Sequence, residues 1–176
     1  LQALEEDEYE VCIDSSLEPG RLTYGECFIP GTTEEEILIS CHSCHPSLAN
    51  DNLAGIAVAV GFAQRLLRIS SRFSYRFLFI PGTIGSITWL ARNESNVDRI
   101  AAGLVAANLG DPGRFHYKKT RRGDAEIDRA VLQVLRGKDH GVEGFVPFGY
   151  DERQYSSPGF DLPATWSATT RHKESE

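Results

Sequence analysis

The sequence contains no methionine, even at position 1, and it has only four cysteines and no long hydrophobic run. The missing methionine predicts that these 176 residues are a fragment of a longer chain. Four cysteines are too few for the disulfide framework of a secreted protein, so we expect reduced thiols and a cytoplasmic location. The longest apolar stretch, from Leu53 to Phe62, is far shorter than the roughly 20 residues that cross a membrane. No membrane partner is therefore expected.

Basic residues are also scarce, since 18 lysines and arginines stand against 25 aspartates and glutamates, for a net charge of −7. A field of this sign repels phosphate backbones, so a nucleic-acid partner is not expected. Hydrophobic residues at 41% and charged residues at 24% are typical of an ordinary globular domain. We therefore predict a single domain over 1–176, truncated at both ends, and leave its oligomeric state open.

Hydrophobic patterning predicts strands and helices that alternate along the chain. Strands are expected at 22–29, 37–39, 73–80, 101–109 and 162–166, and helices at 53–68, 84–93 and 125–136. The first strand is expected to form a hairpin with 9–14, and Asp124 to cap the last helix. This alternation predicts an α/β fold, a three-layer sandwich in which helices flank a mainly parallel mixed sheet. Ligands bind at the carboxyl ends of the strands in such folds.

The densest chemistry lies just after the strand at 37–39, where two histidines and two cysteines follow one another. Cys41 to His45 has the C-x-x-C-H spacing of haem c attachment, and it contains a C-x-x-C that can bind zinc or exchange disulfides. Haem c needs an exported chain, and a redox motif should open a helix, which Pro46 delays here. Both alternatives are disfavoured. The two thiols and His42 are expected to be structural, with the thiols buried.

His45 and Asp51 form a stronger candidate pair. An imidazole at a strand end and a carboxylate at a helix start can converge on one cation. Asn50 and Asn52 would then fix the turn and orient the carboxylate. The alternative is that Asp51 only caps the helix and His45 is a hydrogen-bonded core histidine.

Two further acidic segments, one after the strand at 101–109 and one after a short strand expected at 145–148, are expected at the same end of the sheet. Asp111 lies in a Leu-Gly-Asp-Pro-Gly segment, where it is either a ligand or a turn former. Asp151 and Glu152 lie in an ordered polar loop at 149–155, which either binds a ligand or is held by a salt bridge of Arg153.

Four segments together resemble the bacterial aminopeptidase-like family, which is related in fold to the co-catalytic zinc aminopeptidases. The resemblance covers nearly the whole chain, in order. The segments are Cys44-His45-Pro46-Ser47-Leu48-Ala49-Asn50-Asp51-Asn52-Leu53-Ala54-Gly55, Phe79-Ile80-Pro81-Gly82-Thr83-Ile84-Gly85-Ser86, Leu109-Gly110-Asp111-Pro112-Gly113 and Asp151-Glu152-Arg153-Gln154-Tyr155-Ser156-Ser157-Pro158-Gly159.

The resemblance implies a zinc-peptidase-like fold that binds one or two zinc ions. His45 would be a zinc ligand, Asp51 the carboxylate that bridges two metals, and Asp111 or Asp151 a further ligand or supporting acid. The metals would lower the pKa of a bound water and polarise the scissile carbonyl, while a carboxylate acts as general base. Asp151 and Glu152 are the candidate catalytic residues.

Two departures from the family pattern bear on activity. Gly82 stands where the family has glutamate in Pro-Glu-Thr-Ile-Gly-Ser, and glycine can neither ligate zinc nor take a proton. The late histidine of a Tyr-His-Thr-Ser segment is also missing, and His172 lies in a polar tail. We therefore predict an aminopeptidase-type zinc metallohydrolase with an incomplete site, acting on a peptide or aminoacyl substrate. The alternative is a catalytically inactive peptidase fold used for binding or scaffolding.

Overall fold

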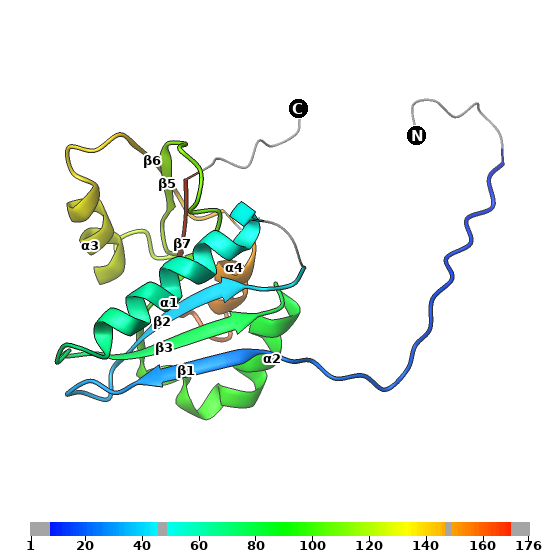
Figure 1. Ribbon diagram of the computed structural model, residues 1–176, viewed down its shortest axis with the longest axis horizontal. Coiled ribbons are helices and arrows are strands. Elements are labelled where there is room, and N and C mark those ends of the chain that lie inside the picture. The colour runs from blue at the N-terminus through cyan, green and yellow to red at the C-terminus, as the bar shows by residue number, and fades with distance from the viewer. Residues whose placement is uncertain (1–7, 46–48, 147–148, 170–176) are drawn as a thin grey trace.

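The computed structural model describes residues 8–45, 49–146 and 149–169, and the described strands form one seven-stranded sheet (Figure 1). The strand order is β1-β3-β2-β4-β7-β5-β6. β1 runs antiparallel to β3 and β5 antiparallel to β7, while the other neighbours are parallel. The strands are β1 (Gly25–Ile29), β2 (Glu36–His42), β3 (Ser74–Ile80), β4 (Ile100–Ala106), β5 (Phe115–Lys118), β6 (His140–Glu143) and β7 (Ala164–Ala168). The predicted mainly parallel mixed sheet is confirmed.

Helices cover both faces of this sheet, which gives the three predicted layers (Figure 1). α1 lies on one face, and α2 and α4 lie on the other. The helical elements are η1 (Ala49–Ala54), α1 (Gly55–Leu66), α2 (Ile84–Asn93), η2 (Glu94–Arg99), α3 (Glu126–Leu135) and α4 (Asp151–Tyr155). No helix in the described ranges is both long and apolar enough to span a bilayer.

The central strand β2 shows how the sequence builds the two cores. Successive side chains of a strand point to opposite faces, so Leu38 and Ile39 enter different layers. Leu38 packs in a buried cluster with Trp89 of α2, while Ile39 and Cys41 pack in the cluster that includes residues of α1. Every residue of β2 is buried except one, as expected for a strand that is covered on both faces.

The N-terminal hairpin prediction was wrong. Residues 8–24 contain no regular element, and β1 pairs with β3 instead. One reason is electrostatic: the Arg76 guanidinium on β3 lies between Glu26 on β1 and buried Glu36 on β2, with Nε 2.6 Å from a Glu36 carboxylate oxygen. The charge on β1 therefore finds its partner on β3.

Four further elements differ from prediction. β5 and β6 were not predicted, because four-residue strands carry little periodic signal. The polar loop expected at 149–155 contains the short helix α4. The start of α3 is set by Asp128 rather than Asp124: the Asp128 carboxylate accepts a hydrogen bond from the Ala125 N–H at 2.9 Å.

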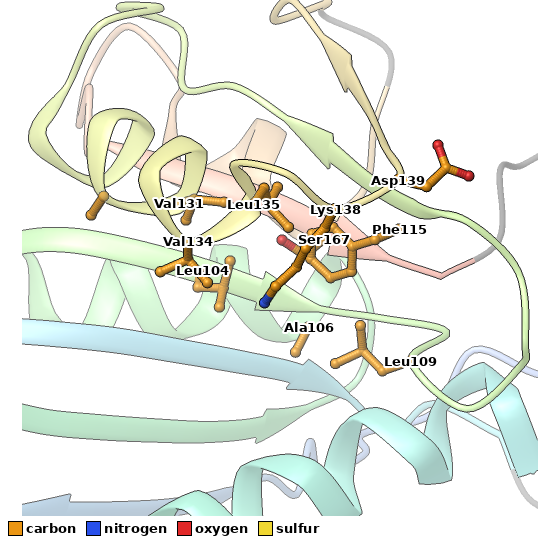
Figure 2. Close-up of a pocket in the computed structure, with 11 residues that line it drawn as sticks. Leu104, Ala106, Leu109, Phe115, Val131, Val134, Leu135, Lys138, Asp139 and Ser167 are labelled. Carbon is orange, nitrogen blue, oxygen red and sulfur yellow. The ribbon is translucent and has the colours of Figure 1, made fainter.

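An apolar hollow of about 470 Å³ lies between α3 and the sheet (Figure 2). Its lining includes side chains of β4, β5 and β7 and is apolar apart from Ser167, Lys138 and Asp139. Asp139 is paired with Arg114, whose Nε is 2.9 Å from a carboxylate oxygen. The hollow therefore differs in chemistry from the polar strand ends described next.

Candidate functional site

The polar cluster forms where β2 and β3 end and where α1, α2 and α4 begin. β2 and β3 are parallel and in register, with His42 opposite Ile80, so their carboxyl ends lie together. The Ser43 N–H continues this pairing with a 2.7 Å hydrogen bond to the Ile80 carbonyl. The Thr83 N–H then donates to Asp151, which ties the start of α2 to that of α4. Three segments distant in sequence thus meet at the carboxyl ends of these parallel strands.

Asp51 lies between two imidazoles. His42 Nε2 is 2.5 Å from Asp51 Oδ1, and His45 Nε2 is 3.8 Å from Asp51 Oδ2. The His42 side chain is 6% exposed, against 38% for His45 and 41% for Asp51. Asp51 therefore has a buried histidine on one side and an exposed histidine on the other. The structure brings the predicted residues His45 and Asp51 together and adds His42, to which sequence reasoning gave only a structural role. The available signal was that His42 ends a buried parallel strand.

Asn52 holds the histidine and the helix start in place. This side chain is buried, and its Nδ2 donates to the Ala106 carbonyl at 2.8 Å and lies 3.5 Å from His42 Nδ1. Its Oδ1 accepts the N–H groups of Gly55 at 3.2 Å and Asn108 at 3.1 Å. With Nδ1 facing this amide donor, the Nε2–H of His42 points to Asp51. Asn52 thus fixes the turn, as predicted, but it contacts the His42 imidazole and not the Asp51 carboxylate that it was expected to orient.

Asp111 serves the loop that follows β4. Its Oδ2 accepts a hydrogen bond from Asn50 Nδ2 at 2.8 Å, and its Oδ1 accepts the Gly113 N–H at 2.6 Å. Asn50 in turn accepts the Gly110 N–H at 2.7 Å. Both carboxylate oxygens are engaged in holding this loop to η1, which is the turn-forming alternative. A ligand role for Asp111 stays a prediction.

Asp151 is a fully buried carboxylate with one engaged oxygen. Oδ1 accepts the Thr83 N–H and the Ser86 hydroxyl, both at 2.8 Å, whereas Oδ2 has no hydrogen-bond partner within the described residues. Burial raises the pKa of Asp151, and these two hydrogen bonds oppose that rise. A buried oxygen without a donor is the kind of group that a ligand or a proton satisfies.

Glu152 is buried and paired, in contrast to Asp151. The Lys118 ammonium lies 2.5 Å from Glu152 Oε1, and the Tyr150 N–H lies 3.2 Å from each carboxylate oxygen. This ion pair holds the loop, a role that the sequence suggested for Arg153. No ion pair of Arg153 occurs in the part of the chain that the structure describes.

The two thiols of the C-x-x-C segment have different environments. Cys41 is fully buried, and burial raises its pKa to about 12. Cys44 is exposed, which contradicts the prediction that both thiols are buried, and its Sγ lies 3.2 Å from the Tyr150 hydroxyl. β2 ends at His42, so the chain has already left the sheet at Cys44. The thiols are free and are not placed as a pair.

The donor types around Asp51 suit zinc, since imidazole and carboxylate are its usual nitrogen and oxygen ligands. Zinc binds these ligands at about 2.0–2.2 Å. An ion between His42 and Asp51 therefore requires their facing atoms to stand farther apart than the 2.5 Å of this hydrogen bond. Across the described ranges, no group of three or more His, Cys, Asp or Glu side chains is arranged to hold a metal ion. His172 lies outside those ranges.

Similar proteins include ones named for an aminopeptidase-like domain, a peptidase and an aminopeptidase. A family model described as a domain of unknown function (DUF4910) matches residues 9–175. A relative from Clostridium acetobutylicum, named "Putative polysaccharide biosynthesis protein with aminopeptidase-like domain", is 55% identical over 160 residues, which are 90% of this chain and 37% of the relative. A crystal structure of a "putative peptidase" from Clostridium acetobutylicum has a TM-score of 0.87 at 50% identity, covering 99% of this chain and 42% of that one.

A more distant solved structure shares the fold. The aminopeptidase from Aneurinibacillus sp. strain AM-1 has a TM-score of 0.65 at 20% identity and covers 84% of this chain and 39% of that chain. At this identity the likeness shows the fold alone. The chain spans less than half the length of each of these three relatives.

Proposed function

This chain belongs to the family described as a domain of unknown function (DUF4910), and we propose that it is the core of an aminopeptidase-type zinc metallohydrolase. The observation that carries the proposal is the Asp51 carboxylate, which offers one oxygen to each of two imidazoles at the carboxyl end of β2. Proteins with open parallel α/β sheets bind ligands at the carboxyl ends of their strands. The names of the relatives and the shared fold support the reaction class.

In this proposal His42, His45 and Asp51 would hold the ion after the His42 and Asp51 side chains move apart from their 2.5 Å contact, and Asp111 remains a candidate for a second ion. Bound zinc supplies a Lewis acid and an activated water. In this state His42 would bind the ion through Nε2 and carry its proton on Nδ1, which lies 3.5 Å from Asn52 Nδ2. Asp151 has a buried oxygen with no hydrogen-bond partner among the described residues, which makes it a candidate base or an acceptor for a substrate donor.

The proposed substrate is a peptide or a small aminoacyl amide, and the proposed catalytic unit is the single domain over 1–176 working as part of a longer protein. The proposal includes no nucleic-acid or membrane partner. Free cysteines are compatible with the proposed cytoplasmic location, where thiols stay reduced.

The test combines zinc binding with hydrolysis. Thermal unfolding with and without zinc measures binding, because a ligand of the folded state raises Tm. Hydrolysis of aminoacyl-p-nitroanilides measures activity. Asp51→Asn should abolish both effects, while Asp98→Asn, the same change at an exposed position of η2, should alter neither. If zinc leaves the Tm of the wild-type chain unchanged, the metal proposal is wrong.

His42→Ala and His45→Ala separate the two imidazoles. If the buried histidine is the main ligand, His42→Ala should weaken zinc binding more than His45→Ala. Loss of an imidazole zinc ligand or of its supporting partners typically costs at least about 10–100-fold in affinity. The reverse order would favour His45, the ligand that the family resemblance implies.

A second candidate function is binding without catalysis. Gly82 favours it, because this position has no side chain to act as ligand or base and the adjacent space is filled by Tyr150. In that case an aminoacyl amide would raise Tm without being hydrolysed in the presence of zinc. Hydrolysis that disappears in Asp51→Asn would exclude this alternative.

A further inference from the structure

Tyr150 lies against the His42–Asp51 pair and occupies the space that position 82 leaves open. Its ring meets the His42 imidazole edge-on, with centroids 4.8 Å apart and an interplanar angle of 70°. Its hydroxyl is 3.2 Å from Cys44 Sγ. A Cβ on residue 82 would overlap this hydroxyl and the neighbouring ring carbons. The placement of Tyr150 therefore depends on glycine at position 82.

The backbone of Tyr150 is fixed, but its hydroxyl is weakly held. The Tyr150 N–H lies 3.2 Å from both oxygens of buried Glu152, which is itself paired with Lys118. Asp151, the next residue, accepts the Thr83 N–H at 2.8 Å. The hydroxyl, in contrast, ends on a thiol, which is a weak donor and a weak acceptor. Exchanging the thiol for a better acceptor costs little while the backbone stays in place.

Amide donors around the pair already have strong acceptors. Asn52 Nδ2 donates to a backbone carbonyl at 2.8 Å, and Asn50 Nδ2 donates to Asp111 at 2.8 Å. The Tyr150 hydroxyl is thus the nearby donor that changes partner most easily. The side chain also extends from the residue before α4, past Gly82, to the end of β2, so that it borders the space beside His42 and Asp51.

We propose that Tyr150 is a substrate-positioning residue whose hydroxyl leaves Cys44 and donates to the carbonyl oxygen of the bond to be cleaved a hydrogen bond that strengthens as negative charge develops on that oxygen. Gly82 is the feature that admits the phenol to this place. The inference rests on the proposed hydrolase function and adds to it the group that orients the peptide or amide carbonyl.

Kinetics of the zinc-loaded chain on an aminoacyl-p-nitroanilide test the role. Tyr150→Phe keeps the ring and removes the donor, and it should lower kcat about 100-fold with little change in KM, as loss of a donor to a developing oxyanion does. Tyr24→Phe, the same change on the segment before β1, should leave kcat and KM unchanged. A Tyr150→Phe variant whose kcat stays within about twofold of wild type, or whose loss lies only in KM, overturns the role.

Gly82→Ala tests the dependence on glycine without removing the donor. The added methyl should displace the phenol and lower kcat, and combining it with Tyr150→Phe should cause little further loss, because both changes remove one interaction. Additive losses would show that the two residues act separately and would contradict the proposed placement.

A second readout does not need activity. In a Cys12→Ser, Cys27→Ser background, Cys44 is the exposed thiol and Cys41 is buried, so a disulfide reagent such as dithionitrobenzoate reports on Cys44. Gly82→Ala should raise its reaction rate several-fold by removing the phenol contact. An unchanged rate in an active chain overturns the Tyr150 inference alone. A wild-type chain that is inactive with zinc refutes the proposed function, and the positioning role with it, whatever the thiol rate.

Discussion

Replacing Asp128 with alanine should cost about 3–5 kcal/mol of unfolding free energy. The Asp128 carboxylate is buried and accepts four hydrogen bonds: from the Tyr117 hydroxyl at 2.8 Å, the Thr120 N–H at 2.9 Å, the Thr120 hydroxyl at 2.5 Å and the Ala125 N–H at 2.9 Å. The two hydroxyls can turn to other acceptors, but the two backbone N–H groups cannot. Each buried donor left without a partner costs about 1–3 kcal/mol, and the carboxylate was also the N-terminal cap of α3.

Urea unfolding followed by circular dichroism measures this loss, and the corresponding fall in Tm is about 6–20 °C for a domain of this size. Asp124→Ala is the matched control: it removes the same group four positions earlier, at the exposed residue that sequence reasoning took for the cap. It should change stability by no more than about 0.5 kcal/mol. If both variants lose the same amount, the Asp128 hydrogen bonds do not stabilise the start of α3 as argued.

Three further results are expected. Arg76→Met should destabilise the chain by about 3–5 kcal/mol, because buried Glu36 loses its cation, and the added change Glu36→Gln should restore part of that loss; no recovery would refute the pairing argument. With zinc chelated, Asp151→Asn should stabilise the chain at neutral pH. Burial raises the pKa of Asp151 in the folded state, so folding favours the protonated carboxyl group. The stability of the wild-type chain therefore declines as the pH rises above the ordinary aspartate pKa, whereas the uncharged asparagine is not affected. The stability gap between this variant and wild type should therefore shrink near pH 4, and a constant gap would contradict the burial argument. Cys41, whose pKa burial raises to about 12, should react with iodoacetamide only after unfolding, while Cys44 reacts in the folded chain.

The layers of the fold were predictable because β2, β3 and β4 are largely buried strands that each contain a continuous apolar run. Two features were not. β1 was assigned a hairpin partner next to it in sequence, while its actual partner is β3, where Arg76 is 50 residues from Glu26 in sequence and forms an ion pair with it. The short strands β5 and β6 depend on β7 for their place in the sheet, which no local pattern encodes.

The site was half predictable for a similar reason. Asp51 and His45 stand out as ligand types at a strand–helix junction, and the structure brings them together. His42 was set aside because it lies inside a conspicuous C-x-x-C-H pattern, although its position at the end of a buried strand gives it the shorter contact to Asp51. The relation of Gly82 to Tyr150 joins positions 68 residues apart and depends on side-chain volume, so the sequence alone could not reveal it.

β7 is the last strand of the described chain, yet it lies between β4 and β5 in the sheet. The ribosome releases β1 to β4 first, and these four can pair with one another in the order β1-β3-β2-β4. β4 then keeps an open edge until residues 164–168 emerge, about 60 residues later, a delay of roughly 3–12 s at ordinary rates of synthesis. During that interval the exposed edge of β4 can pair with another nascent chain. Slow codons between β4 and β7 should therefore lower the yield of folded protein more than slow codons before β4.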